Sequence, residues 1–378
     1  MNVRNLRAVA TALLLGAAAV GAASPAFAQA LPAAVGRPLQ EARTLADSGR
    51  YREAMARIDA AAAAAKSANE NNVVRQMRDY VAVKSGDTST SLGARAKFAA
   101  DANAGRWREV IAGADALRRQ NALDAQSMLV IAQAHYRLND PRACMSYIRS
   151  NRLGGETALA LLQRCAYDAG DDATQRSALE QLVGATGKPE HWKNLLRLAE
   201  RSRGLSDHNT LDILRLKGLT GSYNGADDIT LHVQMALQLK MAAEGKALLE
   251  KSLADKTLPT NDRNNRLVTL ANARVAENAK TAAQTLAAAN SAKEGDGLVA
   301  IGEDMIGQGK AKEAITVIQS GIAKGPKDMA NAQIRLGSAY LAAGQKPQAL
   351  RAFQAAAAAK GDEKTTMVAH LYVTYARR

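Results

Sequence analysis

Apolar and small residues near the C-terminus recur at steps of three and four positions, in two runs on either side of a glycine. In the stretch NAQIRLGSAYLAAGQKPQALRAFQAAAAAKG these positions include Leu336, Gly337, Tyr340, Ala349 and Phe353, and the glycine between the runs is Gly344. Such steps place each set on one face of an α-helix. The stretch is therefore predicted to form two amphipathic helices joined by a turn at Gly344.

The preceding block has the same organisation. Its two runs are separated by Gly309, and Pro326 ends the block. The apolar and small positions of its runs are Ile301, Gly302, Met305, Ala314, Ile318 and Gly321. Because Gly309 and Gly344 are 35 residues apart, the pattern predicts a repeating helix–turn–helix unit of about that length.

The order Leu-Gly, Tyr, Ala, Phe and Pro at these intervals resembles the tetratricopeptide repeat (TPR), a helix–turn–helix unit of about 34 residues. The resemblance is clearest in residues 295–361. The final unit departs from the family pattern with Gln333 in place of Trp and Gly361 in place of Pro, whereas the unit before it has Pro326. The resemblance implies an all-α, right-handed superhelical solenoid of antiparallel helix pairs, which binds a partner in its concave groove.

The spacing of small residues fits closely packed helix pairs. Small residues of the first helix are predicted to face small residues of the second, which lets the two backbones approach. The pairs are Gly337 with Ala349, Gly302 with Ala314, and Ala132 with Cys144. The larger Tyr340 and Phe353 then fill the gap to the next pair. One pair alone cannot bury its apolar face, so the pairs must stack.

Weaker forms of the unit continue toward the N-terminus. Turns are predicted near Gly309, Glu277, Ala242, Gly204, Gly170, Asn139, Gly105 and Gly49. Most intervals are 31 to 38 residues, but Gly49 and Gly105 are 56 residues apart, although the stretches that follow them, GRYREAMARIDA and GRWREVIAGADA, are alike. We therefore expect seven to ten helical hairpins, with irregular helix near residues 67–92.

The glycine-rich stretch LTGSYNG at residues 219–225 is the predicted boundary between two lobes of one solenoid. The lobes are residues 38–220 and 221–378, and residues 29–37 are predicted to be a flexible leader. Residues 1–28 have the pattern of a secretory signal peptide, with the basic MNVRNLR, an apolar alanine-rich run, and SPAFA before a cleavage site after Ala28. An anchor retained in the membrane is the alternative. We expect a periplasmic or secreted chain without a transmembrane segment after signal removal.

Composition supports helices and leaves the partner open. Hydrophobic residues make up 47% of the chain but aromatic residues only 4%, and an alanine excess of this kind favours close helix packing. The formal charge of +14 becomes +12 without Arg4 and Arg7, which suits acidic partners. Because the basic residues are spread along the chain without interleaved aromatics, we expect no nucleic-acid partner.

The sequence offers little for catalysis. Its five histidines are scattered singly, and no HExxH, GxSxG or phosphate-cradling motif occurs. Soluble lytic transglycosylases also carry a long α-superhelix, but their catalytic glutamate motif is missing, and the adjacent Glu303 and Asp304 point in different directions on a helix. A cell-wall enzyme is therefore the least favoured function, and no catalytic residue, cofactor or metal site is predicted.

Two further sets of residues carry specific hypotheses. Cys144 and Cys165 fall at about the same level of neighbouring antiparallel helices and are predicted to form a disulfide, with two buried free thiols as the alternative. Groove-facing candidates on the first helices are Arg95, Gln126, Gln133, Arg137, Asn331 and Ser338. Each is equally explained as a solvated helix residue.

The preferred hypothesis is a non-catalytic periplasmic scaffold that binds a protein or peptide in the groove. The alternative is a module of envelope biogenesis or polysaccharide export that contacts an anionic polymer.

Overall fold

A computed structural model describes residues 31–378, so the predicted signal peptide at residues 1–28 lies outside the described residues. Over this range the chain folds into nineteen α-helices and contains no strand. The protein is an all-α repeat fold, as the periodicity predicts. Its helices divide into two compact units, one that ends at Asp171 and one that spans Asp172–Arg378.

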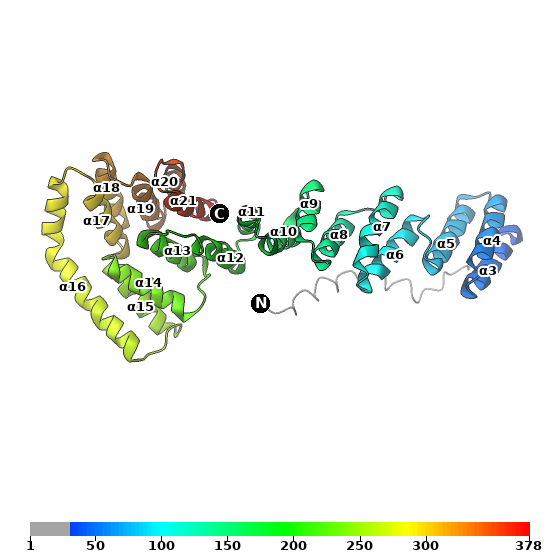
Figure 1. Cartoon of the computed structure of the whole chain (residues 1–378), viewed down its shortest axis with the longest axis horizontal. Coiled ribbons are helices and arrows are strands. Elements are labelled where there is room, and N and C mark those ends of the chain that lie inside the picture. The colour runs from blue at the N-terminus through cyan, green and yellow to red at the C-terminus, as the bar shows by residue number, and fades with distance from the viewer. Residues whose placement is uncertain (1–30) are drawn as a thin grey trace. The chain divides into compact units, whose positions relative to one another are not determined.

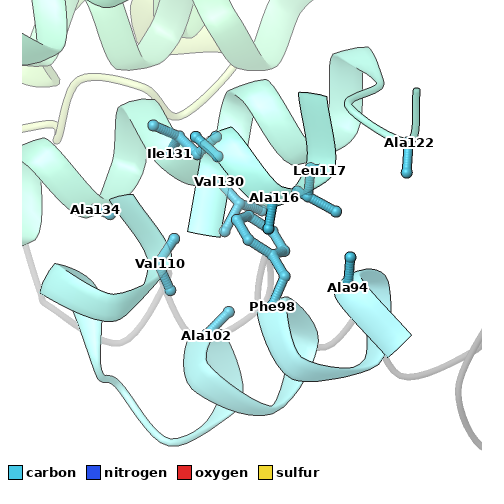
Figure 2. Close-up of a cluster of buried hydrophobic side chains, with 11 residues drawn as sticks. Ala94, Phe98, Ala102, Val110, Ala116, Leu117, Ala122, Val130, Ile131 and Ala134 are labelled. Carbon is cyan, nitrogen blue, oxygen red and sulfur yellow. The ribbon is translucent and has the colours of Figure 1, made fainter. Parts of the chain in front are cut away.

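The first unit is a row of helices in chain order (Figure 1). Its helices are α3 (Ala33–Asp47), α4 (Tyr51–Ala64), α5 (Ala68–Ser85), α6 (Ser91–Asn103), α7 (Trp107–Arg119), α8 (Ala125–Arg137), α9 (Pro141–Ser150) and α10 (Gly155–Ala169). Contacts within this unit join mainly neighbours in the sequence. Figure 2 shows one resulting core, in which Phe98 of α6 lies among Val110 and Leu117 of α7 and Ile131 of α8.

Two features of the first unit differ from simple repeat spacing. The predicted flexible leader at residues 29–37 is wrong from Ala33 onward, because α3 begins there and buries Val35 and Leu39 against its neighbours. The 56-residue interval contains an additional helix, α5. This helix begins with a capping box between Ser67 and Glu70 and ends at Gly86 in the left-handed conformation.

The second unit contains two runs of helices joined by one long helix (Figure 1). Its helices are α11 (Asp172–Thr186), α12 (Pro189–Glu200), α13 (Asp207–Thr220), α14 (Ala226–Gln238), α15 (Ala242–Ala254), α16 (Asp262–Ser291), α17 (Asp296–Gly307), α18 (Ala311–Ala323), α19 (Met329–Ala342), α20 (Lys346–Ala358) and α21 (Glu363–Ala376). The two runs meet because α13 packs on α21 and α15 packs on α17.

The predicted turn near Glu277 is wrong, because α16 runs unbroken for 30 residues through that position. The segment has neither glycine nor proline and is rich in alanine, so nothing in it stops a helix. The turn predicted near Ala242 lies between α14 and α15, where Lys240 adopts a positive φ of 67°.

The division between the two compact units falls between residues 171 and 172 of the chain, whereas the predicted lobe boundary falls between residues 220 and 221. LTGSYNG is a connection inside the second unit. Lys217 on α13 donates a hydrogen bond to Asp228 on α14 at 2.9 Å, and Tyr223 in the connection pairs with His232 on α14 at 2.6 Å. The first bond joins the two flanking helices directly, and the second joins the glycine-rich stretch to α14.

Glycines allow the helices of a pair to approach in the C-terminal repeats. A Cβ atom at Gly302 would lie 2.4 Å from Ile318 Cγ1, and one at Gly337 would lie 2.4 Å from Phe353 Cε1. The Phe353 ring in turn stacks on Tyr372 of α21, with ring centroids 4.7 Å apart. In each of these pairs, a glycine of the first helix therefore leaves room for a large side chain of the second helix.

Candidate functional site

Four of the six groove candidates lie on α6 and α8 of the first unit, and both arginines among them have partners. Arg95 on α6 reaches Asp124, the N-cap residue of α8, with 3.3 Å between Nη1 and Oδ2. The Arg137 guanidinium lies over the Trp107 ring, 5.9 Å from its centroid. The charge of Arg95 is compensated within the chain, and that of Arg137 is directed at an aromatic face.

The two glutamine candidates are in a different situation. Gln126 is exposed and Gln133 is half-buried. They are seven residues apart on α8 and therefore share one face of it. Leu129, which is also half-buried, lies between them on that face.

A polar contact that the sequence did not suggest joins the same face of α8 to α10. The Tyr136 hydroxyl donates to Asp168 Oδ2 at 2.7 Å, and Arg164 Nε donates to the Tyr136 oxygen at 2.9 Å. Burial and the Asp168 carboxylate together raise the pKa of Tyr136. Because these residues are about 30 positions apart in the chain, only the stacking of α8 and α10 brings them together.

The other two candidates lie in the second unit and are turned inward. Asn331 on α19 accepts two hydrogen bonds from Arg335, at 3.1 Å from Nε and 2.7 Å from Nη2. The Ser338 Oγ is buried and has no hydrogen-bond partner in the described part of the chain. The predicted set therefore does not form one site, because two of its six members serve the interior of the second unit.

That interior contains a buried network of charges from four helices. Arg335 of α19 and Asp212 of α13 are both 0% exposed, and their side chains are paired, with 2.6 Å between Nη2 and Oδ2. Arg335 also lies 3.1 Å from Glu303 of α17. Arg215 of α13 bonds to Glu303 at 2.6 Å and to both oxygens of Glu244 of α15, at 2.8 and 2.6 Å. The network joins the two runs of helices in this unit.

The electrostatics of the network follow from its geometry. Burial tends to raise the pKa of Glu244, but the charge and hydrogen bonds of Arg215 outweigh burial and hold that pKa far below its usual range. His232 adds a further contact to Glu244, with 2.9 Å between Nε2 and Oε1. Asp304, next to Glu303 in the chain, has no arginine partner, and burial together with the neighbouring carboxylates raises its pKa.

Sequence reasoning missed this network because its members look ordinary in the sequence. A charged residue with apolar neighbours in a helical sequence can lie on the protein surface as well as in the interior. The only signal was that Arg335 lies three positions after Ala332 and four before Ala339, which places it on one face of the helix with these small residues. Its partner Asp212 is 123 residues away, so no local pattern relates the two.

The cysteines are joined as a disulfide between α9 and α10. Both side chains are 0% exposed, and the Cα atoms of Cys144 and Cys165 are 6.4 Å apart. This is within the range that a disulfide spans. The bond links the second helix of one repeat to the first helix of the next.

The predicted packing residues lie at the helix contacts of the C-terminal repeats. Ala314, Ile318 and Leu336 are buried in one apolar cluster, against which Met305 and Tyr340 pack. Ala349 and Phe353 are fully buried, and Pro326 lies between α18 and α19. These contacts account for the recurrence of the pattern by packing alone.

The possible metal-ligating side chains of residues 31–378 do not gather into a metal site. Nowhere in this range do three or more His, Cys, Asp or Glu side chains come together in a way that could hold a metal ion. The same residues include no helix long and apolar enough to cross a membrane. The buried carboxylates Asp212 and Glu303 are occupied by arginines.

Similarities to known proteins are found among solved structures. No family model matches the sequence, and the curated proteins yield no match. Among solved structures, the chain is similar to the Cut9–Hcn1 hetero-tetramer of the APC/C (13% identity, 83% of this chain and 73% of that chain, TM-score 0.24). It is also similar to a tetratricopeptide repeat protein from Parabacteroides merdae ATCC 43184 (10% identity, 92% and 100%, TM-score 0.21). A third similar structure is the TPR domain of P58(IPK) (14% identity, 91% and 97%, TM-score 0.22).

With TM-scores this low, the class of the protein rests on its own helix pairs. Those pairs have the length, turn positions and small-residue contacts of a TPR-like unit. The chain is an all-α helical repeat protein, and its C-terminal helix pairs resemble the TPR unit.

Proposed function

We propose that the protein is a non-catalytic scaffold that binds a protein or peptide partner through the helix faces of its repeats. The observation that carries the proposal is the stack of helices in the first unit, on which Gln126 and Gln133 share one face of α8, the first exposed and the second half-buried. Stacked repeats present extended faces of this kind for binding. The clustered carboxylates of the second unit are paired with arginines in the interior, which fits a structural role better than acid–base catalysis.

We further propose that the scaffold acts in the periplasm or outside the cell. The signal-peptide pattern at residues 1–28 supports this location. The buried bond between Cys144 and Cys165 supports it as well, because disulfides persist in oxidising compartments and are rare in the cytosol.

Crosslinking in the periplasm followed by affinity purification of the chain tests the proposal. We expect a defined protein partner whose recovery survives high salt. If the chain instead recovers no protein and sediments with purified wall material in a salt-dependent manner, the proposal fails in favour of anionic-polymer binding, for which spread basic charge would be responsible.

A further inference from the structure

The interior of the second unit holds more carboxylates than arginines. The guanidinium groups of Arg215 and Arg335 bond to three carboxylates, those of Asp212, Glu244 and Glu303. Two positive and three negative charges give these groups a net charge of minus one. A fourth carboxylate beside them is therefore buried against negative charge, which disfavours its ionised form.

Asp304 of α17 is that fourth carboxylate. Its Oδ1 atom is buried and has no hydrogen-bond partner in the described part of the chain, while Gln308 donates to Oδ2 at 2.9 Å. Burial raises the pKa of Asp304, and the carboxylates of Glu244 and Glu303 raise it further. The amides of Gln308 and Asn278 oppose this shift of the pKa but do not cancel it. The position therefore suits the neutral carboxylic acid better than the carboxylate.

Asp304 lies where α17 meets two other elements of this unit. Asn278 of α16, which lies beside Asp304, donates a hydrogen bond to the Lys240 carbonyl in the turn between α14 and α15, at 3.2 Å. The end of α17 also packs closely on the start of α15, since a Cβ atom at Gly307 would lie 2.8 Å from the Glu244 backbone nitrogen. A charge on Asp304 therefore acts on the contacts of α17 with both α15 and α16.

The charged and titratable groups around Asp304 come from several elements. They are Glu303 of α17 itself, Glu244 of α15, His232 of α14, Arg215 of α13 and Arg335 of α19. His232 bonds to Glu244, with 2.9 Å between Nε2 and Oε1. The neighbouring α16 contributes the uncharged Asn278, and α18 packs on α17 through the apolar Ile318. The positive charges nearest to Asp304 are thus already bonded to other carboxylates.

We infer that Asp304 is a proton-operated latch that fastens α17 to α15 and α16. When Asp304 takes up a proton from solvent, a negative charge beside Glu244 and Glu303 is removed and the new O–H becomes a hydrogen-bond donor, so the three helices pack more tightly. When the proton leaves at higher pH, repulsion between the carboxylates loosens the same contacts. The latch regulates the second unit and does not depend on the partner of the proposed scaffold.

The direction of the pH response follows from the charges. Because the pKa of Asp304 is raised in the folded state, its unfavourable contribution is absent below the usual value of 3.8 and grows as the pH rises above it. Glu244 has the opposite sign, but its favourable contribution is lost only below about pH 4.5. The contacts of α17 should therefore be tighter at about pH 5 than at about pH 7.5.

Hydrogen–deuterium exchange of the full chain at these two pH values tests the inference, read in peptides from α17 and the second half of α16 and corrected for intrinsic exchange rates. The variant is Asp304→Asn, which stays uncharged, and the matched control is Asp227→Asn at an exposed position of α14. We expect wild-type exchange to be about threefold or more slower at the lower pH. Asp304→Asn should be as protected at the higher pH as the wild type is at the lower, and the control should follow the wild type.

Two results would overturn the latch. Wild-type exchange that is the same at both pH values shows that no latch operates, and a pH response that Asp304→Asn retains assigns it to another group, such as His232 or Glu244. A carboxyl ¹³C titration of the wild type, with the Asp304 signal assigned by its absence from Asp304→Asn or by sequential assignment, gives a readout that needs no folded variant. A midpoint at or below the usual aspartate value of 3.8 would also overturn the inference.

Discussion

Arg335 is the side chain on which the interior of the second unit depends most. It is 0% exposed, and its guanidinium is surrounded by Asp212, Glu303 and Asn331. Burying a charge is costly unless it is paired and hydrogen-bonded. The network satisfies that requirement only because all of its members are present together.

Replacing Arg335 with Met is expected to lower the free energy of unfolding of the second unit by about 3–5 kcal/mol, because the buried carboxylates Asp212, Glu303 and Glu244 are then left to share Arg215. Urea unfolding followed by the fluorescence of Trp192, in a Trp107→Phe background, measures the effect on this unit. The matched control is Arg351→Met on α20, where the arginine is exposed, and it should change stability little. A loss no larger than that of the control would contradict the role of the network.

Acid should weaken the second unit through Glu244. Because the pKa of Glu244 is lower in the folded state than in the unfolded state, its contribution is present above about pH 4.5 and is lost as the pH falls below that value. Glu244→Gln should therefore be less stable than the wild type at pH 7, and the difference in stability should shrink toward pH 3.

Asp304 should behave in the opposite way, because its pKa is raised in the folded state. Asp304→Asn should therefore be more stable than the wild type at pH 7. Unfolding curves of the wild type and both variants at pH 7 and pH 3 show whether Glu244→Gln lowers the stability and Asp304→Asn raises it.

At the scale of the helix pair, a missing side chain decides how α19 and α20 pack. Gly337→Ala places a Cβ about 2.4 Å from the fully buried Phe353 ring, which already stacks on Tyr372. We expect a loss of about 1–3 kcal/mol from overpacking. The control Gly184→Ala lies in α11 with open space around its Cβ and should be neutral or stabilising. Thermal unfolding of both variants measures the contrast, and equal effects would contradict the packing explanation.

The bond between α9 and α10 should stabilise the first unit. Cys144→Ser/Cys165→Ser is expected to lose about 3 kcal/mol, because the cross-link closes a loop of 21 residues that the unfolded chain otherwise samples freely. Chemical denaturation followed by Trp107 fluorescence reports on this unit. Counting thiols in denatured, unreduced protein is the direct check, and two titratable thiols would show that the bond does not form.

At the scale of the whole molecule, the two units should differ in how they unfold. Contacts in the first unit join mainly sequence neighbours, whereas bonds across 88 and 123 residues close the second unit. A stack held by contacts between neighbouring helices unfolds in steps. Contacts between residues far apart in the chain favour one cooperative transition. Each unit contains one tryptophan, Trp107 or Trp192. Single-tryptophan variants should therefore give a broad transition for the first unit and a sharp one for the second, and two identical curves would contradict this.

Repeat spacing predicted most of the fold but failed where it was extrapolated. The turns at Gly309 and Gly344 were placed correctly, because a glycine with positive φ ends each first helix locally. The turn near Glu277 was inferred from spacing alone, and the uninterrupted helix-forming sequence of α16 shows the error. Of the groove candidates, Gln126 is exposed and Gln133 half-buried on α8, whereas Asn331 bonds to the buried Arg335 and the Ser338 Oγ is buried.

The local structure of this protein, namely its helices, most of its turns and the small residues through which paired helices meet, follows from short stretches of sequence. These depend on residues within about one helix pair of each other, whose preferences can be read from the chain. Only the tertiary structure decided that α13 meets α17 and α19, that Arg335 finds Asp212, and that one polar face is used internally while another stays available. Such contacts join residues far apart in the chain, and the burial that makes them necessary exists only once the helices have packed.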